Sequence, residues 1–540
     1  MAGDRRGARR LRLALQILSL SLFVFLLGRA ARPAAEGFLP PDLYLRLDPS
    51  SLLAGSLAAL ALLGAALLLG RFFCGGLCPF GLTLDLARKI LSFFGPKARS
   101  GGPSPARRLK FLILALLAGA VLGGYNLFFL AAPLPLITRL YALVFDPALS
   151  AGANAALDLG RPLLESLGWS GAAYAGLARR AFDSLAFLLP FFAVVFLLEL
   201  VRPRFWCRFL CPSGALLALF SRKPLWRRRV SGCTGCGLCV RRCPTAAIGP
   251  DALSCAHGEC LSCQLCVDIC PARAISFRFS EFPAKAPEES GPTLPFPPTS
   301  LPAMSRRAFL LSASASAAGL GLAAGLPLIS SKNAALVRPP GSRPEAHFLD
   351  RCLRCGECMK ACPTNGLAPA GPAGGFGGLF SPYLLARRGP CEPDCIRCGQ
   401  VCPTGAVVKL SLEQKRWVKI GTAVLLEDQC LAWAQGRRCM VCQEVCPYAA
   451  IELHQSGGQP VPVPVVDPLR CYGCGYCEYH CPVAPAAIVV KAEGALRLND
   501  PDIYYIEAQI QGLQLGSHER EPDYGQLEDE QLPPGFIDLD

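Results

Sequence analysis

Histidine is scarce in this chain of 540 residues: there are only five, and none lies before His257. The apolar part of the chain therefore has no ligands for a bis-histidine haem. The pattern Cys-x-x-Cys-His, which attaches c-type haem, does not occur either. We expect a protein without haem.

Acidic residues are also few, with 40 Asp and Glu against 54 Lys and Arg, a formal net charge of +14. The excess sits in two loops between apolar runs. Residues 71–110 carry eight basic residues and one acidic residue, Asp85, and residues 202–229 carry eight basic residues. Residues 28–50 and 132–183 are balanced. This alternation indicates membrane topology rather than a nucleic-acid partner.

Apolar residues make up 52% of the chain, and the mean hydropathy is +0.36. Four membrane helices are predicted, at Leu13–Leu27, Leu52–Leu69, Phe111–Leu130 and Leu185–Leu198. With the basic loops inside, the N-terminus, the 71–110 loop and the chain after Val201 face the cytoplasm. Residues 133–180 are predicted to form helical segments at the outer surface. Glu199 is either a proton acceptor for a quinol or a solvated helix end.

A candidate export signal lies in mid-chain, at Met304–Ile329. Arg306 and Arg307 precede Phe309-Leu310 and a mildly apolar run diluted by serine and glycine. This is typical of a twin-arginine export signal. An ordinary membrane helix with two flanking positive charges is the alternative. If the segment is an export signal, residues 331–540 are expected in the periplasm.

The 29 cysteines are the most informative residues. Four runs have the spacing Cys-x2-Cys-x2-Cys-x3-Cys-Pro: Cys233, Cys236, Cys239 and Cys243; Cys260, Cys263, Cys266 and Cys270; Cys352, Cys355, Cys358 and Cys362; and Cys471, Cys474, Cys477 and Cys481. Two variants follow the same plan: Cys391, Cys395, Cys398 and Cys402; and Cys430, Cys439, Cys442 and Cys446. Such runs bind [4Fe–4S] clusters, with the fourth cysteine ligating the neighbouring cluster. Zinc knuckles or a disulfide framework would not repeat this pattern six times. The chain is predicted to carry six [4Fe–4S] clusters.

The crossover of the fourth cysteine predicts ligand sets for the first two motifs. Cys233, Cys236, Cys239 and Cys270 hold one cluster, and Cys260, Cys263, Cys266 and Cys243 hold the other. The last four motifs allow two arrangements. Sequential pairing joins the third motif with the fourth and the fifth with the sixth. Nested pairing joins the third with the sixth and the fourth with the fifth.

The apolar half contains a repeat whose two copies match over eleven residues. Arg71-Phe-Phe-Cys74-Gly-Gly-Leu-Cys78-Pro-Phe-Gly81 aligns with Arg204-Phe-Trp-Cys207-Arg-Phe-Leu-Cys211-Pro-Ser-Gly214. Cys-x3-Cys places both thiols on one helix face. Both copies are predicted at the cytoplasmic side, so Cys74, Cys78, Cys207 and Cys211 can converge. They are candidates for a metal centre, a redox dithiol or the wall of a quinone pocket, and buried structural thiols are the alternative. Cys255 belongs to no motif.

These motifs resemble two protein families. Residues 1–280, with four apolar runs, two Cys-x3-Cys-Pro motifs and two cluster motifs, resemble the NapH-type membrane quinol dehydrogenase component of periplasmic nitrate reductase systems. Residues 304–498, with a twin-arginine signal and four cluster motifs, resemble the MauM/NapG-type ferredoxins. The resemblance implies electron flow from quinol to a periplasmic reductase or cytochrome. The fusion of the two into one chain departs from both families.

The expected fold is a membrane α-helical protein, with four helices plus a signal or anchor helix, joined to α+β bacterial-ferredoxin-like [4Fe–4S] domains. The expected parts are a membrane domain (1–228), a cytoplasmic two-cluster domain (229–280), a Pro-rich linker (281–303), the signal helix (304–330), a periplasmic four-cluster domain (331–498) and an acidic tail (499–540). We expect a multi-pass protein of the bacterial inner membrane with residues 229–303 in the cytoplasm. It takes electrons from the quinone pool. The rival functions are a conduit from a cytoplasmic donor and a maturation factor for a respiratory reductase.

Overall fold

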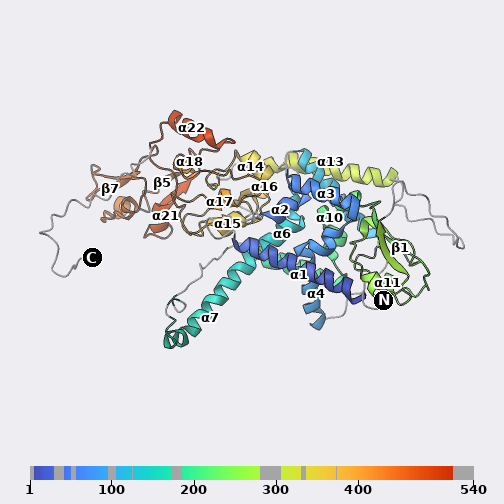
Figure 1. Cartoon of the computed structure of the whole chain (residues 1–540). Helices are drawn as coiled ribbons and strands as arrows, with labels where there is room; N and C mark the ends of the chain where they lie inside the picture. The colour runs from blue at the N-terminus through green and yellow to red at the C-terminus, as the bar shows by residue number, and fades with distance from the viewer. Residues whose placement is uncertain are drawn as a thin grey trace. The chain divides into compact units, whose positions relative to one another are not determined.

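The computed structural model describes residues 5–29, 42–49, 51, 56–94, 105–123, 126–169, 171, 174, 182, 185–279, 306–329, 336–371 and 374–514. They belong to two compact units (Figure 1). The first comprises Met1–Asn333, Ser342–Tyr383 and Arg397–Lys409; the second comprises Ala334–Gly341, Leu384–Ile396 and Leu410–Asp540. The predicted linker 281–303 and residues 515–540 of the predicted tail lie outside the described residues.

Helices dominate the first unit. The longer ones are α1 (Arg5–Arg29), α3 (Leu57–Leu69), α4 (Pro79–Phe94), α5 (Leu109–Leu122), α7 (Asp146–Ser166), α9 (Leu185–Val201) and α13 (Arg306–Ile329). The shorter ones are α2 (Leu43–Leu47), α6 (Pro133–Leu140), α10 (Pro212–Phe220), the 3-10 turns η3 (Pro105–Arg108) and η4 (Phe128–Leu130), and the π-helical turns η2 (Phe73–Leu77), η5 (Tyr141–Phe145) and η6 (Trp206–Leu210). In Figure 1, α1 lies beside α4, and the two helices are in contact.

A helix forms at each of the four predicted membrane segments, but not with the predicted lengths. Only α1 among these four meets the length and apolarity of a membrane span, over Arg10–Arg29. The described helices α3, α5 and α9 are apolar but shorter than the roughly 20 residues that a hydrocarbon core requires. Helix α5 ends at Leu122 with Gly123 as its C-cap, and Phe128–Leu130, at the end of the predicted span, forms the turn η4.

The segment after α5 is more regular than predicted. Residues Pro133–Ser166 form one helical run, in which α6, η5 and α7 follow one another without a break. This run is the second described segment that meets the length and apolarity of a membrane span. Residues 170, 172, 173 and 175–180 of the predicted surface region lie outside the described residues.

The cluster-bearing regions have little regular structure, as expected when each loop is built to wrap a cluster. Their short helices are α11 (Leu238–Arg242), η7 (His257–Glu259), α12 (Leu265–Asp268), α14 (Glu345–Arg351), α15 (Glu357–Ala361), α16 (Gly375–Gly378), α17 (Arg397–Gln400), α18 (Leu412–Arg416), α19 (Leu431–Gln435), α20 (Val441–Glu444), α21 (Tyr476–His480), η9 (Pro501–Ile503) and α22 (Tyr504–Ile510). The strands are β1 (Trp226–Val230), β2 (Ile275–Phe279), β3 (Leu367–Pro369), β4 (Pro382–Leu384), β5 (Thr422–Leu425), β6 (Ile451–His454), β7 (Val463–Val466) and β8 (Ile488–Lys491). They pair as four two-stranded sheets: β1 with β2, β3 with β4, β5 with β8 and β6 with β7.

Helix α13, which lies in the predicted signal segment, packs along α5 with the two backbones in direct contact. An ideal Cβ on Gly119 would lie 1.9 Å from the carbonyl oxygen of Ser316, and one on Gly319 would lie 1.9 Å from that of Leu116. Only glycine permits this approach, and small residues are the usual means by which apolar helices associate. Gly319 of α13 therefore serves helix packing.

This contact predicts that bulk at the crossing point separates the two helices. Gly319→Val should lower the stability of the detergent-solubilised protein by about 1–3 kcal/mol, because the valine must displace the α5 backbone. Gly321→Val is the matched control, since a Cβ there meets nothing within 4 Å. Thermal unfolding measures both. Equal melting temperatures for the two variants would contradict the α5–α13 contact.

Candidate metal centres

The four regular cluster motifs share one local backbone structure. The residue after the second cysteine has a left-handed conformation and starts a short helix that carries the third cysteine. Gly356 (φ 89°) and Gly475 (φ 86°) occupy this position in the third and sixth motifs, whereas Gln264 (φ 57°) occupies it in the second. Glycine is favoured there because a side chain strains this backbone region. The reversal thus separates the second cysteine from the short helix that carries the third.

The first two motifs are brought together as the crossover rule predicts. Burial raises the pKa of the Cys243 thiol, and the nearby Cys263 and Cys260 thiols raise it further. The fourth cysteine of the first motif therefore lies with the first cysteines of the second. Cys266 and Cys270 pack on the same small core. The backbone N–H of Ala247 donates to Cys243 Sγ at 3.3 Å.

The third and fourth motifs are also neighbours. Burial raises the pKa of the Cys358 thiol well above its ordinary value, and besides Cys355 and Cys352 of its own motif, Cys402 and Cys398 contribute to the rise. The helices α15 and α17, which carry these two motifs, are in contact. This arrangement favours sequential pairing over nested pairing.

Two predicted metal ligands, Cys362 and Cys395, fall in different compact units. Cys362 ends the third motif in the first unit, and its Sγ lies 3.4 Å from the hydroxyl of Thr364. Cys395 belongs to the second unit, because the division falls inside the fourth motif, after Ile396. The division separates the first two cysteines of the fourth motif from Cys398 and Cys402. Their assignment as ligands stays a prediction from spacing.

A longer step between cysteines accompanies this division. The fourth motif has three residues between Cys391 and Cys395, where the regular motifs have two. Its short helix α17 starts at Arg397, two residues beyond Cys395, just as α15 starts two residues beyond Cys355. The extra residue therefore lies before the second cysteine and does not change where the helix begins.

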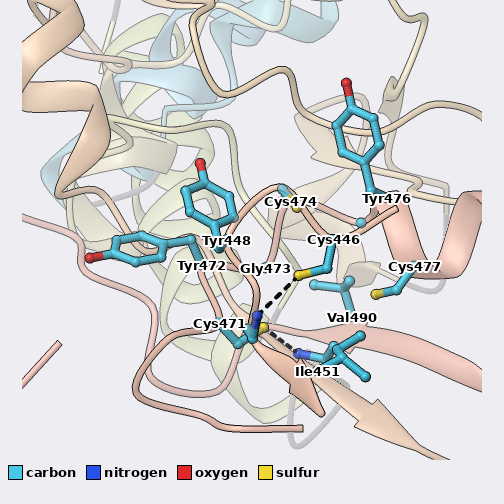
Figure 2. Close-up of a pocket in the computed structure, with 13 residues that line it drawn as sticks. Cys446, Tyr448, Ile451, Cys471, Tyr472, Gly473, Cys474, Tyr476, Cys477 and Val490 are labelled. Carbon is cyan, nitrogen blue, oxygen red and sulfur yellow. Dashed lines mark hydrogen bonds between the residues drawn. The ribbon is translucent and has the colours of Figure 1, made fainter. Parts of the chain in front are cut away.

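The fifth and sixth motifs meet around two cavities in the second unit. One is lined by Cys471, Cys474 and Cys477 with Cys446 of the fifth motif (Figure 2). The other is lined by Cys430, Cys439 and Cys442 with Cys481 of the sixth motif. Each cavity thus collects three cysteines of one motif and the fourth of the other. At both cavities the fifth motif lies with the sixth, and each motif supplies its last cysteine to the cavity of the other. This arrangement favours sequential pairing with crossover.

The cavity of Figure 2 fits a [4Fe–4S] cluster in more than its cysteines. The backbone N–H of Ala423 donates to Cys471 Sγ and that of Ala450 to Cys446 Sγ, both at 3.3 Å. Hydrogen bonds to the sulfurs and burial are what set cluster potentials. Tyr448 and Tyr472 stack at a centroid distance of 4.9 Å and also line the cavity. All 29 cysteines are free thiols, so no disulfide competes for these ligands.

The two Cys-x3-Cys-Pro motifs have identical local structure. Each first cysteine lies in a π-helical turn, η2 or η6, and each second cysteine ends that turn. The following prolines, Pro79 and Pro212, start α4 and α10. The prediction of two thiols on one helix face is therefore wrong in detail, because the second thiol caps the next helix. The predicted convergence is present: all four thiols line one cavity.

The two copies of the repeat interlock through arginine and glycine. Arg71 of the first copy lies against Gly214 of the second, where an ideal Cβ would be 2.7 Å from Arg71 Nη2. Arg204 of the second copy lies against Gly81 of the first, at 3.3 Å, and donates to the carbonyl oxygen of Cys74 at 2.8 Å. Because each arginine occupies the space left by the other copy's glycine, the pair is reciprocal.

The carboxylates of Asp85 and Glu199 bind the turn that contains Arg204. Asp85 accepts from Arg204 Nη2 at 2.7 Å and from Nε at 3.1 Å. Burial favours the neutral form of Asp85, but the charge and hydrogen bonds of Arg204 outweigh it and hold its pKa below the ordinary value. Glu199 is fully buried, and its two oxygens accept the backbone N–H groups of Arg204 and Phe205 at 2.7 and 2.8 Å. The prediction of a solvated helix end is therefore wrong.

The second cluster motif is docked against the repeat by charge. Glu259, which precedes Cys260, pairs with Lys110 at 2.5 Å and with Arg71 at 3.3 Å. Both cationic side chains are buried, and the side chain of Glu259 is only 13% exposed. An ideal Cβ on Gly75 would lie 2.1 Å from the carbonyl oxygen of Leu261. The Cys74–Cys78 turn therefore packs directly on the loop that carries Cys260 and Cys263.

The third cluster motif is docked on α6 within the same unit. Arg139 Nε donates to the carbonyl oxygen of Arg354, which lies between Cys352 and Cys355, at 3.0 Å. Lys360 pairs with Asp146 at the start of α7 at 3.1 Å. Sequence reasoning missed these docking residues. It also missed the place of Cys255, whose side chain hydrogen-bonds to Cys260.

Within the described part of the chain, no three His, Cys, Asp or Glu side chains are grouped around a single metal ion.

Comparison with known proteins identifies several cluster-binding regions in the chain. Models described as "4Fe-4S binding domain" match residues 51–98 and 184–232, residues 230–249 and 347–367, and residues 257–273. A model described as "4Fe-4S dicluster domain" matches residues 437–484. The first of these covers both copies of the Cys-x3-Cys-Pro repeat.

Several curated proteins are similar to part of the chain. The methylamine utilization ferredoxin-type protein MauM of Methylorubrum extorquens is 37% identical over 179 residues, which is 32% of this chain and 80% of the relative. The ferredoxin-type protein NapG of Escherichia coli is 36% identical over 201 residues, 35% of this chain and 86% of the relative. The ferredoxin-type protein NapF of Escherichia coli is 34% identical over 150 residues, 27% of this chain and 81% of the relative. No solved structure matches the chain.

Proposed function

Since the chain belongs to the family of ferredoxin-type proteins MauM and NapG, we propose that it carries electrons from a membrane quinol to a periplasmic acceptor. It is an iron–sulfur electron-transfer protein with multiple [4Fe–4S] binding domains. The proposal adds the donor, the membrane and the direction. The acceptor is a periplasmic reductase or cytochrome, by analogy with the NapH and NapG pair.

The observation that carries the proposal is the docking of cluster motifs on apolar helices in the first unit. Glu259 fixes the second motif to Arg71 after α3 and to Lys110 in α5. Arg139 on α6 fixes the third motif. A soluble ferredoxin has no use for such helices. A carrier fed from the bilayer needs its clusters beside the membrane surface.

The proposed topology follows the positive charges. The N-terminus and residues 71–110 and 202–303 lie in the cytoplasm, and residues 331–540 lie in the periplasm. The twin-arginine segment Met304–Ile329 directs export of the second half after its clusters are assembled. Helix α13 then stays in the membrane as an anchor, which the close contact of Gly119 and Gly319 with the facing backbones supports.

In the ligand sets we propose, each cluster takes three cysteines from one motif and the last cysteine of its partner. The sets are Cys233, Cys236, Cys239 and Cys270; Cys260, Cys263, Cys266 and Cys243; Cys352, Cys355, Cys358 and Cys402; Cys391, Cys395, Cys398 and Cys362; Cys430, Cys439, Cys442 and Cys481; and Cys471, Cys474, Cys477 and Cys446. The set with Cys362 and Cys395 rests on the crossover rule alone. When bound, each cluster accepts and releases one electron. The protein's part is to fix ligand spacing, to exclude water and to direct N–H groups at the sulfurs.

Anaerobic reduction by a quinol tests this function. The full chain, purified in detergent with its clusters, should develop the EPR signals of reduced clusters when a menaquinol analogue is added. Cys207→Ala should abolish rapid reduction by the quinol but not reduction by dithionite. If dithionite reduces the wild-type clusters and the quinol does not, the quinol assignment is wrong.

One observation favours a second candidate, a conduit fed by a cytoplasmic donor. Cys233 and Cys236 of the first motif are exposed, unlike most other cluster cysteines. A cluster held there would be open to a soluble reductant. Reduction of the intact protein by a cytoplasmic ferredoxin, with no response to quinol, would establish this candidate.

A further inference from the structure

The segment that leads into the fourth cluster motif packs against the sixth motif inside the second unit. This segment, Leu384–Ile396, belongs to the second unit together with Leu410–Asp540. An ideal Cβ on Gly475 would lie 2.5 Å from the Cβ of Ala386. Gly475 is also the left-handed residue that starts α21, with φ 86°. Glycine therefore permits both the backbone reversal of the sixth motif and the close approach of the segment.

Arg387 fixes the segment to the end of α21. Its Nη1 donates to the carbonyl oxygens of Cys481 at 2.7 Å and Glu478 at 3.0 Å, and its Nη2 donates to that of Val483 at 3.1 Å. The last carbonyl groups of a helix have no partner within the helix, and a cation is favoured beside them. The guanidinium thus holds the segment beside the last cysteine of the sixth motif.

Where the fourth motif begins, the contact joins one predicted cluster ligand to another. The backbone N–H of Cys391 donates to the backbone carbonyl oxygen of Cys474 at 2.7 Å. Cys391 is the first cysteine of the fourth motif, and Cys474 is the second of the sixth and lines the cavity of Figure 2. The two thiols are therefore connected through the covalent bonds of two residues and a single hydrogen bond.

Tyr476 and Glu392 hold this hydrogen bond in place. Tyr476 lines the cavity of the sixth motif, and its hydroxyl points away from the cysteines there (Figure 2). The hydroxyl donates to Oε2 of Glu392, the residue after Cys391, at 2.7 Å. Burial raises the pKa of Tyr448 well above its ordinary value, and the nearby Cys474 and Cys391 thiols raise it further. A second tyrosine therefore lies beside both thiols.

We propose that the contact of Cys391 with Cys474 is the junction through which single electrons pass between the cluster of the fourth motif and that of the sixth. One cluster is oxidised by one electron as the other is reduced, and no proton moves and no bond is made or broken. Tyr476, Glu392 and Arg387 are positioning residues for this step. The inference rests on the ligand sets proposed above, but not on the quinol, the membrane topology or the direction of electron flow.

The junction gives the clusters of the second half an order. Electron tunnelling slows exponentially with distance, and it is faster along bonds and hydrogen bonds than across a gap. The segment also meets the cavity of the fifth motif, because Arg387 binds the carbonyl oxygens of Cys481 and Val483, which line it. Arg387 is not a ligand, so a path through it is longer, since it must run along the chain to Cys391. Electrons should therefore pass between the fourth and fifth clusters by way of the sixth.

Freeze-quench EPR of the full chain tests this order without using a quinol. The protein is purified anaerobically with its clusters and receives a substoichiometric flash of electrons from a photoreductant. The signals of the fourth, fifth and sixth clusters are assigned by their loss in Cys398→Ala, Cys442→Ala and Cys477→Ala. In the wild type the electron should redistribute among all three clusters. In Cys477→Ala the exchange between the fourth and fifth clusters should be lost, and exchange at the wild-type rate would overturn the junction.

Tyr476→Phe tests the junction with every ligand in place. Exchange between the fourth and sixth clusters should become several-fold slower at an unchanged iron content, because the segment of Cys391 loses its hydroxyl anchor. Tyr505→Phe is the matched control, since the hydroxyl of Tyr505 accepts from Gln509 at 2.8 Å on the exposed side of α22. Equal exchange rates in the two variants would overturn the role of Tyr476.

Glu392→Gln gives a readout that a purely structural role would not move. Glutamine keeps an acceptor for Tyr476 but removes a negative charge beside two clusters. The midpoint potentials of the fourth and sixth clusters should therefore both become more positive, and that of the fifth should change least. Glu413→Gln, on the exposed surface of α18, is the control and should shift none of them. Unchanged potentials in Glu392→Gln would overturn the placement of Glu392 between the two clusters.

Failure of the proposed function would be seen separately. If Cys398→Ala loses no iron or sulfide, the ligand set that contains Cys391 is wrong, and the junction is overturned with it. If the clusters are present and exchange electrons in the expected order but a quinol does not reduce them, the quinol assignment alone is wrong.

Discussion

Cys446→Ala should remove one whole cluster, about four irons, from the second unit. Cys446 shares its cavity with Cys471, Cys474 and Cys477 (Figure 2). Without the fourth thiolate one iron loses its ligand. Iron and sulfide analysis of the purified holoprotein, together with EPR after dithionite reduction, measures the loss.

Pairs of substitutions show which motif Cys446 serves. Cys446→Ala/Cys477→Ala should lose no more iron than Cys446→Ala alone, because both ligands belong to one cluster. Cys446→Ala/Cys442→Ala should lose about twice as much, since Cys442 lines the other cavity. Nested pairing gives a different result: Cys446→Ala/Cys398→Ala would then lose only one cluster. That result would contradict the ligand sets proposed here.

The pairing of the last four motifs shows where prediction from sequence ends. The spacing identifies each set of four cysteines, because three-residue steps on a loop suffice to describe one motif. It does not say which motif supplies the fourth ligand to another. That depends on contacts such as α15 with α17 and α20 with α21, between segments far apart in the chain. Sequential and nested pairing have the same local pattern.

The fourth motif shows the same limit within a single run of cysteines. Spacing treats Cys391, Cys395, Cys398 and Cys402 as one element, yet the division between the compact units passes between Cys395 and Cys398. Local sequence carries no signal for such a boundary, because it depends on which distant segments each half of the run packs against. The crossover of Cys362 to the fourth motif is therefore a prediction from spacing, whereas Cys446 lines one cavity with three cysteines of the sixth motif.

The Cys-x3-Cys-Pro repeat contains a sequence signal for the contact between its two copies. The aligned copies place arginine three residues before the first cysteine and glycine three residues after the second. The structure explains both positions, since Arg71 occupies the space at Gly214 and Arg204 that at Gly81. The π-helical turns had no such signal. They result from how the two copies pack, and i+4 spacing alone predicts an ordinary helix.

The lengths of the apolar helices were the least predictable feature of the fold. Hydropathy locates apolar runs well, but helix ends depend on local caps such as Gly123. The docking residues were invisible for a different reason. In the sequence, Glu259 is simply an acidic residue beside a cluster motif. Its ion pairs with Arg71 and Lys110 depend on the fold, because these residues lie far from it in the chain.

Glu259→Gln should destabilise the first unit by about 3–5 kcal/mol, because it leaves two buried cations without their anion. Lys110 is fully buried and Arg71 nearly so. Thermal unfolding in detergent measures the change. Glu452→Gln is the control, since the exposed Glu452–Arg470 pair should contribute less than about 1 kcal/mol. Similar melting temperatures for the two variants would contradict a structural role for the Glu259 pairs.

The loss of stability in Glu259→Gln should arise because Lys110 and Arg71 remain buried without an anion, rather than because an attraction is lost. A buried ion pair replaced by apolar groups of similar size is often close to neutral in stability, whereas removal of one partner is not. Lys110→Met/Glu259→Gln should therefore recover part of the loss, and Arg71 should account for the remainder. A double variant less stable than Glu259→Gln alone would mean that Lys110 finds another anion. Recovery together with the EPR signal of the second cluster would show that the charges position the Cys260 loop against the repeat.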